Sequence, residues 1–499
     1  MDLFTIGFPT ALSWVNLLYC LLGVFLGTFV GVLPGISGLT AVALLMPLSF
    51  HLDPTTAIIM LGGLYYGAEY GGSTASILLN LPGTASNAIT CLDGYPMARQ
   101  GRAGPALFIT TIASFVGAAV GTVLVMLLAP PLAQFALAFG SAEYFAAMLL
   151  GLVAAGTIGQ GRRIKSVAMV VLGMILGLIG IDTNTGEFRY TYGFANLYDG
   201  FPIVILAMGM FGVAEVIASI NQLKYVTEVG QITVRSLLPT RDDMRSIVKP
   251  VSRGAAVGSF FGPLPGTGPT IAFFIAYAIE KRVSRDPSRF GKGAVEGIAA
   301  PEAANNAAAQ TSFIPTLTLG IPGAATMAIM LGALLIHGIQ PGPQLIGEHP
   351  DLFWGVIASF WIGNVFLLVL NIPMIGLWVR ILHIPYRYLY PTILVLICIG
   401  VYSLNNQVFD VGLVILFGVL GYALKLMQFE PAPLLIGFIL GPMVEENFRR
   451  ALVLTHGDYL ALLERPITAG FLAVTVLLLA GMGWSTWRAH QRRKAASPD

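Results

Sequence analysis

Apolar stretches long enough to cross a membrane recur from one end of this 499-residue sequence to the other. Each approaches or exceeds the roughly 20 residues that a helix needs to cross the hydrocarbon core. Only 10% of the residues are charged, whereas a soluble domain carries about 25%, so much of the folded surface is expected to face lipid. The clearest stretches are residues 14–33, 105–128, 164–181, 201–220, 352–377 and 467–487.

Backbone polar groups in lipid must be satisfied within the protein, which leaves only helices and closed barrels. A barrel would alternate apolar and polar residues over short segments, whereas these apolar stretches are continuous. The sequence therefore predicts an all-α polytopic membrane protein with about 12 membrane segments, counted from stretches of spanning length. No basic segment precedes the first stretch, so we expect it to be retained rather than cleaved as a signal peptide.

Two Pro-Gly motifs occur in the same order in both halves of the chain. Residues 31–35 (Gly-Val-Leu-Pro-Gly) resemble residues 262–266 (Gly-Pro-Leu-Pro-Gly), and these form the first motif. Residues 81–83 (Leu-Pro-Gly) resemble residues 321–323 (Ile-Pro-Gly), and these form the second motif. In each half a glutamate lies between the two motifs and a Gly- and Pro-rich turn follows the second one. This order favours an internal duplication.

Lysine and arginine are distributed oppositely in the two halves. Between the two motifs, residues 50–54 contain no Lys or Arg, whereas residues 280–292 contain five. After the second motif the bias reverses, since the first half has Arg99 and Arg102 and residues 338–351 have none. Cytoplasmic loops are enriched in Lys and Arg. Equivalent loops are therefore expected on opposite sides of the membrane, which is the pattern of an inverted-topology repeat.

The basic segment 221–253 and the loop near Lys281 should both be cytoplasmic, so the chain between them must enter the membrane and return on the same side. Its centre, residues 262–269, is rich in Gly and Pro and suits a hairpin tip better than a helix. We therefore predict a re-entrant hairpin there, with residues 14–50 as its periplasmic counterpart. Two full spans broken by a Pro-Gly kink are the alternative.

These patterns predict five parts of the chain. They are a first membrane repeat at residues 1–220, a basic cytoplasmic loop at 221–253, the core of the second inverted repeat at 254–345, a C-terminal helical scaffold at 346–487 and a basic cytoplasmic tail at 488–499.

The Pro-Gly motifs are the predicted substrate region. A helix broken at membrane depth presents free N–H groups and the positive end of its dipole, which hold an anion without a buried Lys or Arg. A simple helix kink is the alternative at each motif taken alone. The predicted substrate-binding residues are Pro34, Gly35, Ser37, Gly38, Asn80, Pro82, Gly83, Thr84, Pro265, Gly266, Thr267, Gly268, Pro322 and Gly323.

Glu69 and Glu302 lie among small residues in otherwise apolar surroundings. An ionisable group at membrane depth is costly and points to function. Residues three and four apart share a helix face, so polar neighbours are expected beside each acid, and carboxylates beside amides suit coupling to Na⁺ or H⁺. In the alternative, Glu302 only caps a helix near the membrane surface. The predicted cation-coupling residues are Glu69, Ser73, Glu302, Asn305 and Asn306, with no cofactor and no metal beyond Na⁺.

The motifs at residues 31–38, 66–76, 80–84, 301–306 and 320–323 closely resemble those of the large membrane subunit of tripartite tricarboxylate transporters. The likeness covers nearly the whole chain. It implies a bacterial inner-membrane secondary transporter that imports citrate or another organic carboxylate, driven by a Na⁺ or H⁺ gradient. It also implies two partners, a small four-helix membrane subunit and a periplasmic substrate-binding protein.

Other classes of function remain as alternatives. A channel, or a transporter of small anions that works without a binding protein, would share many of these features. An intramembrane enzyme would need a catalytic motif such as Gly-x-Ser-x-Gly or His-Glu-x-x-His, and a pump of the P-loop type would need a Walker A sequence, none of which occurs. The net charge of +2 gives no reason to expect nucleic acid as a partner.

Overall fold

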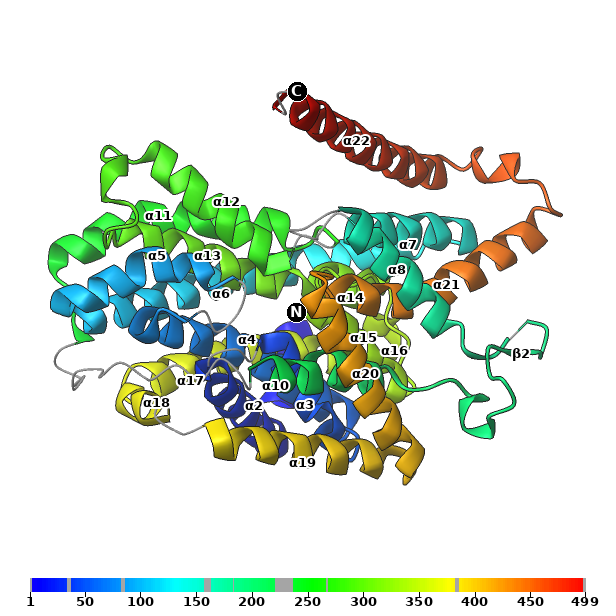
Figure 1. The fold of residues 1–499 in the computed structure, drawn as a ribbon, viewed down its shortest axis with the longest axis horizontal. Coiled ribbons are helices and arrows are strands. Elements are labelled where there is room, and N and C mark those ends of the chain that lie inside the picture. Colours follow the sequence, from blue (N-terminus) through cyan, green and yellow to red (C-terminus); the bar gives the residue numbers. More distant parts are fainter. Residues whose placement is uncertain are drawn as a thin grey trace. The chain divides into compact units, whose positions relative to one another are not determined.

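The computed structural model describes residues 2–33, 37–81, 86–156, 163–182, 184–219, 237–265, 268–381 and 386–496. Helices make up most of these residues (Figure 1). The sheet within the described part is a single antiparallel pair, in which β1 (Gly180–Ile181) pairs with β2 (Phe188–Arg189). The prediction of an all-α protein is confirmed for this part of the chain.

The chain separates into two compact units. The first consists of residues 1–136 and 204–423, and the second consists of residues 137–203 and 424–499. All of the predicted substrate-binding and cation-coupling residues belong to the first unit.

The helices of the first unit, in chain order, are α1 (Phe8–Ala11), α2 (Trp14–Val32), α3 (Gly38–Ser49), α4 (Pro54–Leu79), α5 (Ala88–Met97), α6 (Ala103–Ala136), α9 (Ile203–Ala207), α10 (Ala214–Ser219), α11 (Arg241–Phe261), α12 (Gly268–Val283), α13 (Glu296–Thr311), α14 (Phe313–Leu319), α15 (Ala325–Ile336), α16 (Leu345–Glu348), α17 (Pro350–Asn371), α18 (Ile375–Ile381), α19 (Tyr386–Asn405) and α20 (Val408–Leu426). Short π-helical or 3₁₀ segments are η1 (Leu3–Gly7), η2 (Ala98–Arg102), η4 (Met208–Val213) and η7 (Pro287–Arg289).

The second unit contains α7 (Ser141–Ala155), α8 (Arg163–Gly177), η3 (Ala195–Leu197), α21 (Ala432–Leu454), η8 (Leu460–Leu462) and α22 (Pro466–Ala496). Helix α7 packs against both α21 and α22. Helix α8 packs closely on α21, because Gly173 and Gly437 carry no side chain where the two backbones meet. Asp182, directly after β1, forms ion pairs with Arg189 and Arg449.

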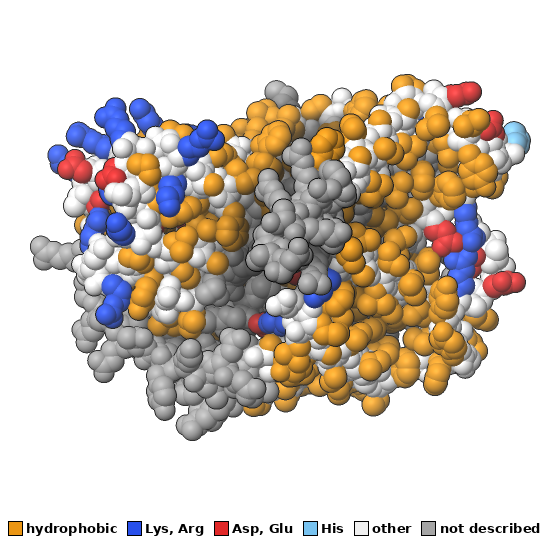
Figure 2. Space-filling model, turned by 45° about the horizontal axis from the view of Figure 1, so that its top comes forward, with side chains coloured by type: hydrophobic (Ala, Val, Ile, Leu, Met, Phe, Trp, Pro, Cys, Tyr) orange, Lys and Arg blue, Asp and Glu red, His pale blue; other side chains and the backbone are white. Residues whose placement is uncertain are grey.

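Within the described residues, five helical stretches are long and apolar enough to cross a membrane, judged by length and composition. Six shorter helices are also apolar. Hydrophobic side chains cover much of the surface seen in Figure 2. The chain therefore has several membrane helices, while the count of about 12 segments stays a prediction. The five are Trp14–Val32, Ala88–Ala136, Pro350–Asn371, Val408–Leu426 and Pro466–Trp484.

Helix α2 packs on α4, and α11 packs on α13, with their backbones in direct contact. Glycines four residues apart allow this approach, because a Cβ atom at any of them would collide with the backbone of the partner helix. The contacts join Gly23, Gly27 and Gly31 to Met60, Leu64 and Ala68, and join Gly254, Gly258 and Gly262 to Ala300, Ala304 and Ala308. The contacted residues on α13 have sequence numbers 240 higher than the contacted residues on α4, so that Ala300 is the counterpart of Met60.

The same offset of 240 relates the helix ends that precede the second motif. Helix α4 ends at Asn80 with a φ of 57°, and α14 ends at Gly320 with a φ of 66°. Both residues adopt the left-handed conformation that commonly terminates a helix, and Asn and Gly tolerate it best. Both first motifs also separate helices, since α2 ends before α3 and α11 ends before α12. The breaks are therefore present, and the side from which each pair enters the membrane stays a prediction.

Candidate functional site

The two predicted acids lie in the interior of the first unit. Glu69 is on α4 with 6% of its surface exposed, and Glu302 is on α13 with none exposed. Glu302 occupies the second turn of α13 rather than its first turn, so it does not cap that helix. Buried carboxylates need hydrogen-bond donors or cations around them, and the partners of these two acids come from several helices.

Hydroxyl groups from three other helices surround Glu302. Ser73 on α4 and Thr90 on α5 donate to its Oε1 atom over 2.7 and 2.6 Å. Ser114 on α6 donates to its Oε2 atom over 3.2 Å. Among the described residues, neither Lys nor Arg pairs with this carboxylate. Glu302 therefore connects four helices through neutral donors, and its negative charge has no cationic partner among them.

Glu69 has a different environment. Asn305 on α13 donates its side-chain N–H to Oε2 of Glu69 over 2.9 Å. The Oε1 atom faces the start of α3, because a Cβ atom added to Gly38 would lie 3.1 Å from it. Ser37 caps α3 by accepting the backbone N–H of Thr40 over 3.2 Å. One oxygen of Glu69 therefore lies beside the first turn of the helix that follows the first motif.

By the offset of 240, the two acids do not occupy equivalent positions. Position 302 corresponds to Gly62 on α4, and position 69 corresponds to Ala309 on α13. Their proximity is produced by the packing of α4 on α13, where Glu69 meets Asn305 and Ser73 meets Glu302.

Helix α13 also carries buried amides whose oxygens accept no hydrogen bond from the residues that the structure describes. Asn305 donates to Glu69, and Asn306 donates to the backbone carbonyl of Glu302 over 3.1 Å, but neither side-chain oxygen has a donor in this part of the chain. The side-chain oxygen of Gln310 is likewise buried without a described partner. An unsatisfied buried acceptor costs about 1–3 kcal/mol. The sequence analysis missed Gln310, although its spacing of four from Asn306 was a signal.

The predicted substrate-binding residues are only partly described. Ser37, Gly38, Asn80, Pro265, Gly268, Pro322 and Gly323 belong to the described part of the chain. Pro34, Gly35, Pro82, Gly83, Thr84, Gly266 and Thr267 lie outside the described residues.

In the second half, the two motifs lie against each other. A Cβ atom added to Gly323 would lie 3.0 Å from the carbonyl oxygen of Gly262, and one added to Gly268 would lie 3.5 Å from the Cβ atom of Ala324. Across the halves, the hydroxyls of Ser86 and Thr270 are 3.1 Å apart. The residues after the second motif of the first half therefore meet the first turn of α12, and α15 packs on α3 in the reciprocal arrangement.

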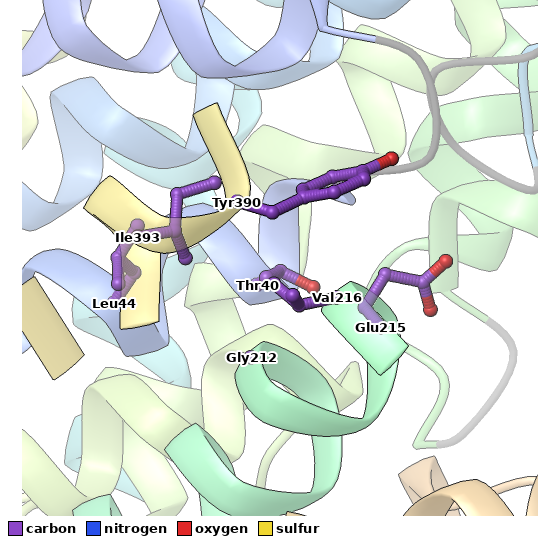
Figure 3. A pocket seen from close by; sticks show the side chains of 7 residues that line it. All are labelled: Thr40, Leu44, Gly212, Glu215, Val216, Tyr390 and Ile393. Atoms are coloured by element: carbon purple, nitrogen blue, oxygen red, sulfur yellow. The ribbon is translucent and has the colours of Figure 1, made fainter. Parts of the chain in front are cut away.

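A pocket lies beside the first turns of α3 (Figure 3). Thr40 and Leu44 from α3 line one side, and Glu215 from α10 and Tyr390 from α19 contribute polar groups. The remaining lining residues are Gly212, Val216 and Ile393. Because Thr40 bonds to the capping Ser37, this pocket adjoins the start of the helix that Glu69 faces.

Comparison with known proteins identifies the family. The model of the tripartite tricarboxylate transporter TctA family matches residues 17–436. The chain belongs to the TctA family. Membership confirms the resemblance inferred from the Pro-Gly motifs, and the chain is accordingly a multi-pass membrane protein of a transporter family rather than of an enzyme family. The word tripartite implies that partner subunits work with it.

Two relatives from Agrobacterium vitis resemble this TctA-family chain along much of their length. An uncharacterized 52.8 kDa protein in the TAR-I ttuC' 3'region is 50% identical over 477 residues, which are 95% of each chain. An uncharacterized protein in the TAR-II ttuC' 3'region is 54% identical over 217 residues, which are 44% of this chain and 90% of the relative.

Proposed function

We propose that this chain is the substrate-translocating large subunit of a binding-protein-dependent secondary transporter, which imports a citrate-like tricarboxylate or another organic carboxylate. The observation that supports it most directly is the pair of buried carboxylates, Glu69 and Glu302, held between α4 and α13 beside the chain breaks. Such a pair binds a coupling cation, Na⁺ or H⁺, close to the position where an anionic substrate meets helix ends.

The proposal includes two inverted copies of one structural unit. Three features support the duplication: the two glycine contacts between helices, the left-handed residues Asn80 and Gly320, and the common offset of 240 residues. The opposite Lys and Arg bias of equivalent loops supports the inversion. In this arrangement the first motifs of the two repeats enter the membrane from opposite sides. All four Pro-Gly motifs then meet near the midplane of the membrane.

Transport then follows from differential binding. The carboxylate substrate binds between the Pro-Gly motifs, where backbone N–H groups and small hydroxyl groups replace the water molecules that hydrate it. The cation binds at the acids and stabilises the loaded state. One repeat then moves relative to the other. The substrate and the cation drive this movement only to the extent that they bind one conformation of the transporter more tightly than the other. A small four-helix membrane subunit and a periplasmic binding protein are the proposed partners, in the inner membrane with the C-terminus in the cytoplasm.

The test is uptake into proteoliposomes that contain this chain, the small membrane subunit and the binding protein, with no ATP. Radiolabelled citrate and a panel of di- and aromatic carboxylates are supplied under an imposed Na⁺ or H⁺ gradient. We expect accumulation that requires both the gradient and the binding protein. Uptake that needs no binding protein would instead favour an anion transporter of another kind, and uptake that only equilibrates substrate would favour a channel.

A further inference from the structure

We propose that the exposed face of α11 and α12 binds one anionic phospholipid, with its phosphate beside Lys249 and Arg282. One of its acyl chains lies along Ala256 and Phe260. This inference does not depend on which substrate is transported. The two helices pack on each other (Figure 1), and α13 packs on both of them. The side chains that stay exposed change from basic at the open end of this helix pair to apolar near the Pro-Gly motif that joins the helices.

An ion pair fixes how the two helices align. Arg253 on α11 donates to both carboxylate oxygens of Glu280 on α12, over 2.9 and 2.6 Å. The end of α11 packs near the start of α12, so the helices run antiparallel. Lys249 precedes Arg253 by four positions, and Arg282 follows Glu280 by two. At a rise of 1.5 Å per residue, both cations therefore lie on the open-end side of the ion pair and within about 6 Å of it along the helices.

The exposed face has the length of one lipid tail. Lys249, Ala256 and Phe260 are spaced by seven and four positions, so they share one face of α11, and all three are exposed. Ile279 and Arg282 share an exposed face of α12 in the same way. From Lys249 to Phe260 the helix rises about 16 Å, and one leaflet of the hydrocarbon core is about 15 Å thick. A lipid whose phosphate lies at Lys249 therefore ends its acyl chain near Phe260.

The charges at the open end favour an anion. Neither Lys249 nor Arg282 forms an ion pair with a residue that the structure describes. Glu280, the acid closest to them along the helices, is already paired. Asp242 lies two turns from Lys249, and Asp286 accepts a backbone N–H and a hydroxyl of its own loop. Two exposed cations on neighbouring helices therefore lack a fixed anion, and a lipid phosphate supplies one.

The apolar half of the face favours a lipid over a free anion. Phe260 is 66% exposed, and Leu264, Phe274 and Ile279 on the same helix pair are also exposed. Free phosphate would neutralise the cations but would leave these side chains uncovered. A phospholipid supplies its charge and its hydrocarbon in the order in which the protein presents basic and apolar side chains.

The experiment titrates the purified full-length chain in detergent with phosphatidylglycerol or with phosphatidylcholine of the same acyl chains. Native mass spectrometry counts the bound lipids. We expect one phosphatidylglycerol to bind more tightly than phosphatidylcholine. Lys249→Gln and Arg282→Gln should each raise its dissociation constant about fivefold, the contribution of one Lys or Arg near an anionic membrane surface, and the double variant about 25-fold. Glycerol phosphate, which has the charge without the acyl chains, should not displace the lipid.

Lys292→Gln is the matched control, because it removes the same charge from an exposed residue after the end of α12 and outside this face. An equal loss of affinity in the control would mean that net charge alone attracts the lipid, and the proposal would be wrong. Equal affinity of the wild type for the two lipids would also overturn it, and this comparison decides the question even if the variants do not fold.

Two further outcomes would assign the face to another ligand. Displacement of phosphatidylglycerol by glycerol phosphate would make it a site for free anions. Release of the lipid when the small membrane subunit is added would make it a protein interface. Either result would overturn the proposal, whereas failure of carboxylate uptake with intact lipid binding would reject only the proposed function.

Discussion

Asp93 and Gly291, 198 positions apart in the sequence, are joined by a hydrogen bond of 2.8 Å from the backbone N–H of Gly291 to Oδ1 of Asp93. The same oxygen accepts the backbone N–H groups of Gly293 and Ala294 over 2.9 and 2.8 Å. Oδ2 accepts the hydroxyl of Tyr277 over 3.0 Å. This fully buried carboxylate on α5 therefore holds the chain that connects α12 to α13.

Replacement of Asp93 by Ala should release that connection. The three backbone N–H groups would lose their acceptor, and hydrogen bonds to a charged group contribute about 1.5–3 kcal/mol each, so the melting temperature should fall. Ala294→Cys reports the release, since Ala294 is buried beside Asp93. In the Asp93→Ala background a water-soluble maleimide should label this cysteine several-fold faster.

The matched control for Asp93 is Asp286→Ala, which removes an exposed acid that bonds only within the same connection. It should change neither the labelling rate nor the melting temperature. Unchanged labelling of Ala294→Cys after loss of Asp93 would mean that the packing of Phe290 and Tyr277, and not the carboxylate, holds this segment.

Glu69→Gln and Glu302→Gln should fail in different ways. Asn305 is the side chain of the described residues that donates to Glu69, and it can still donate to an amide oxygen. Glu69→Gln should therefore fold normally and lose gradient-driven accumulation by at least about tenfold. Glu302 accepts hydroxyls from three helices, so Glu302→Gln should also lower the melting temperature. Uptake and thermal unfolding are measured in parallel on both variants. An equal fall in melting temperature for Glu69→Gln and Glu302→Gln would contradict this prediction.

Gly258→Ala should destabilise the first unit. A Cβ atom at this position collides with the backbone of Ala304, so α11 and α13 must separate, and overpacking of this kind costs about 1–3 kcal/mol. Alanine favours a helix over glycine by only about 0.5–1 kcal/mol, so the collision dominates. Gly412→Ala on α20 is the control, because open space surrounds Gly412. A melting temperature that rises equally in both variants would show that the close contact has no energetic role.

Asp182 in the second unit should make stability depend on pH. The backbone N–H of Asn184, the Thr185 hydroxyl and the guanidinium groups of Arg449 and Arg189 hold the pKa of Asp182 well below its ordinary value of 3.8. A lowered pKa stabilises the folded state above the ordinary value, and this contribution disappears as the pH falls through the lowered one. Asp182→Asn should therefore lower the melting temperature at pH 7 and have a smaller effect below about pH 4. An effect independent of pH would exclude the charge as its cause.

The sequence was sufficient for the class of fold and for the family. Continuous apolar stretches exclude a soluble surface, and they exclude a barrel because the strands of a barrel alternate apolar and polar residues. The Pro-Gly motifs favour helix breaks locally, since proline lacks the N–H that a helix needs and glycine adds flexibility, and Asn80 and Gly320 just before the second motif adopt a left-handed conformation. These properties depend on residues close together in the chain.

The partners of the acids were decided only by the tertiary structure. Ser73, Thr90 and Ser114 are 188 to 229 positions from Glu302, and they reach it because α4, α5 and α6 all pack around α13. Gly117 lets the backbone of α6 approach that of α13 at Ala303, next to Glu302. Helix periodicity puts Glu302, Asn306 and Gln310 in one line, but it does not say whether donors face them. Hydrogen bonds within a helix are set by sequence neighbours, whereas the donors around a buried charge are set by which helices pack together.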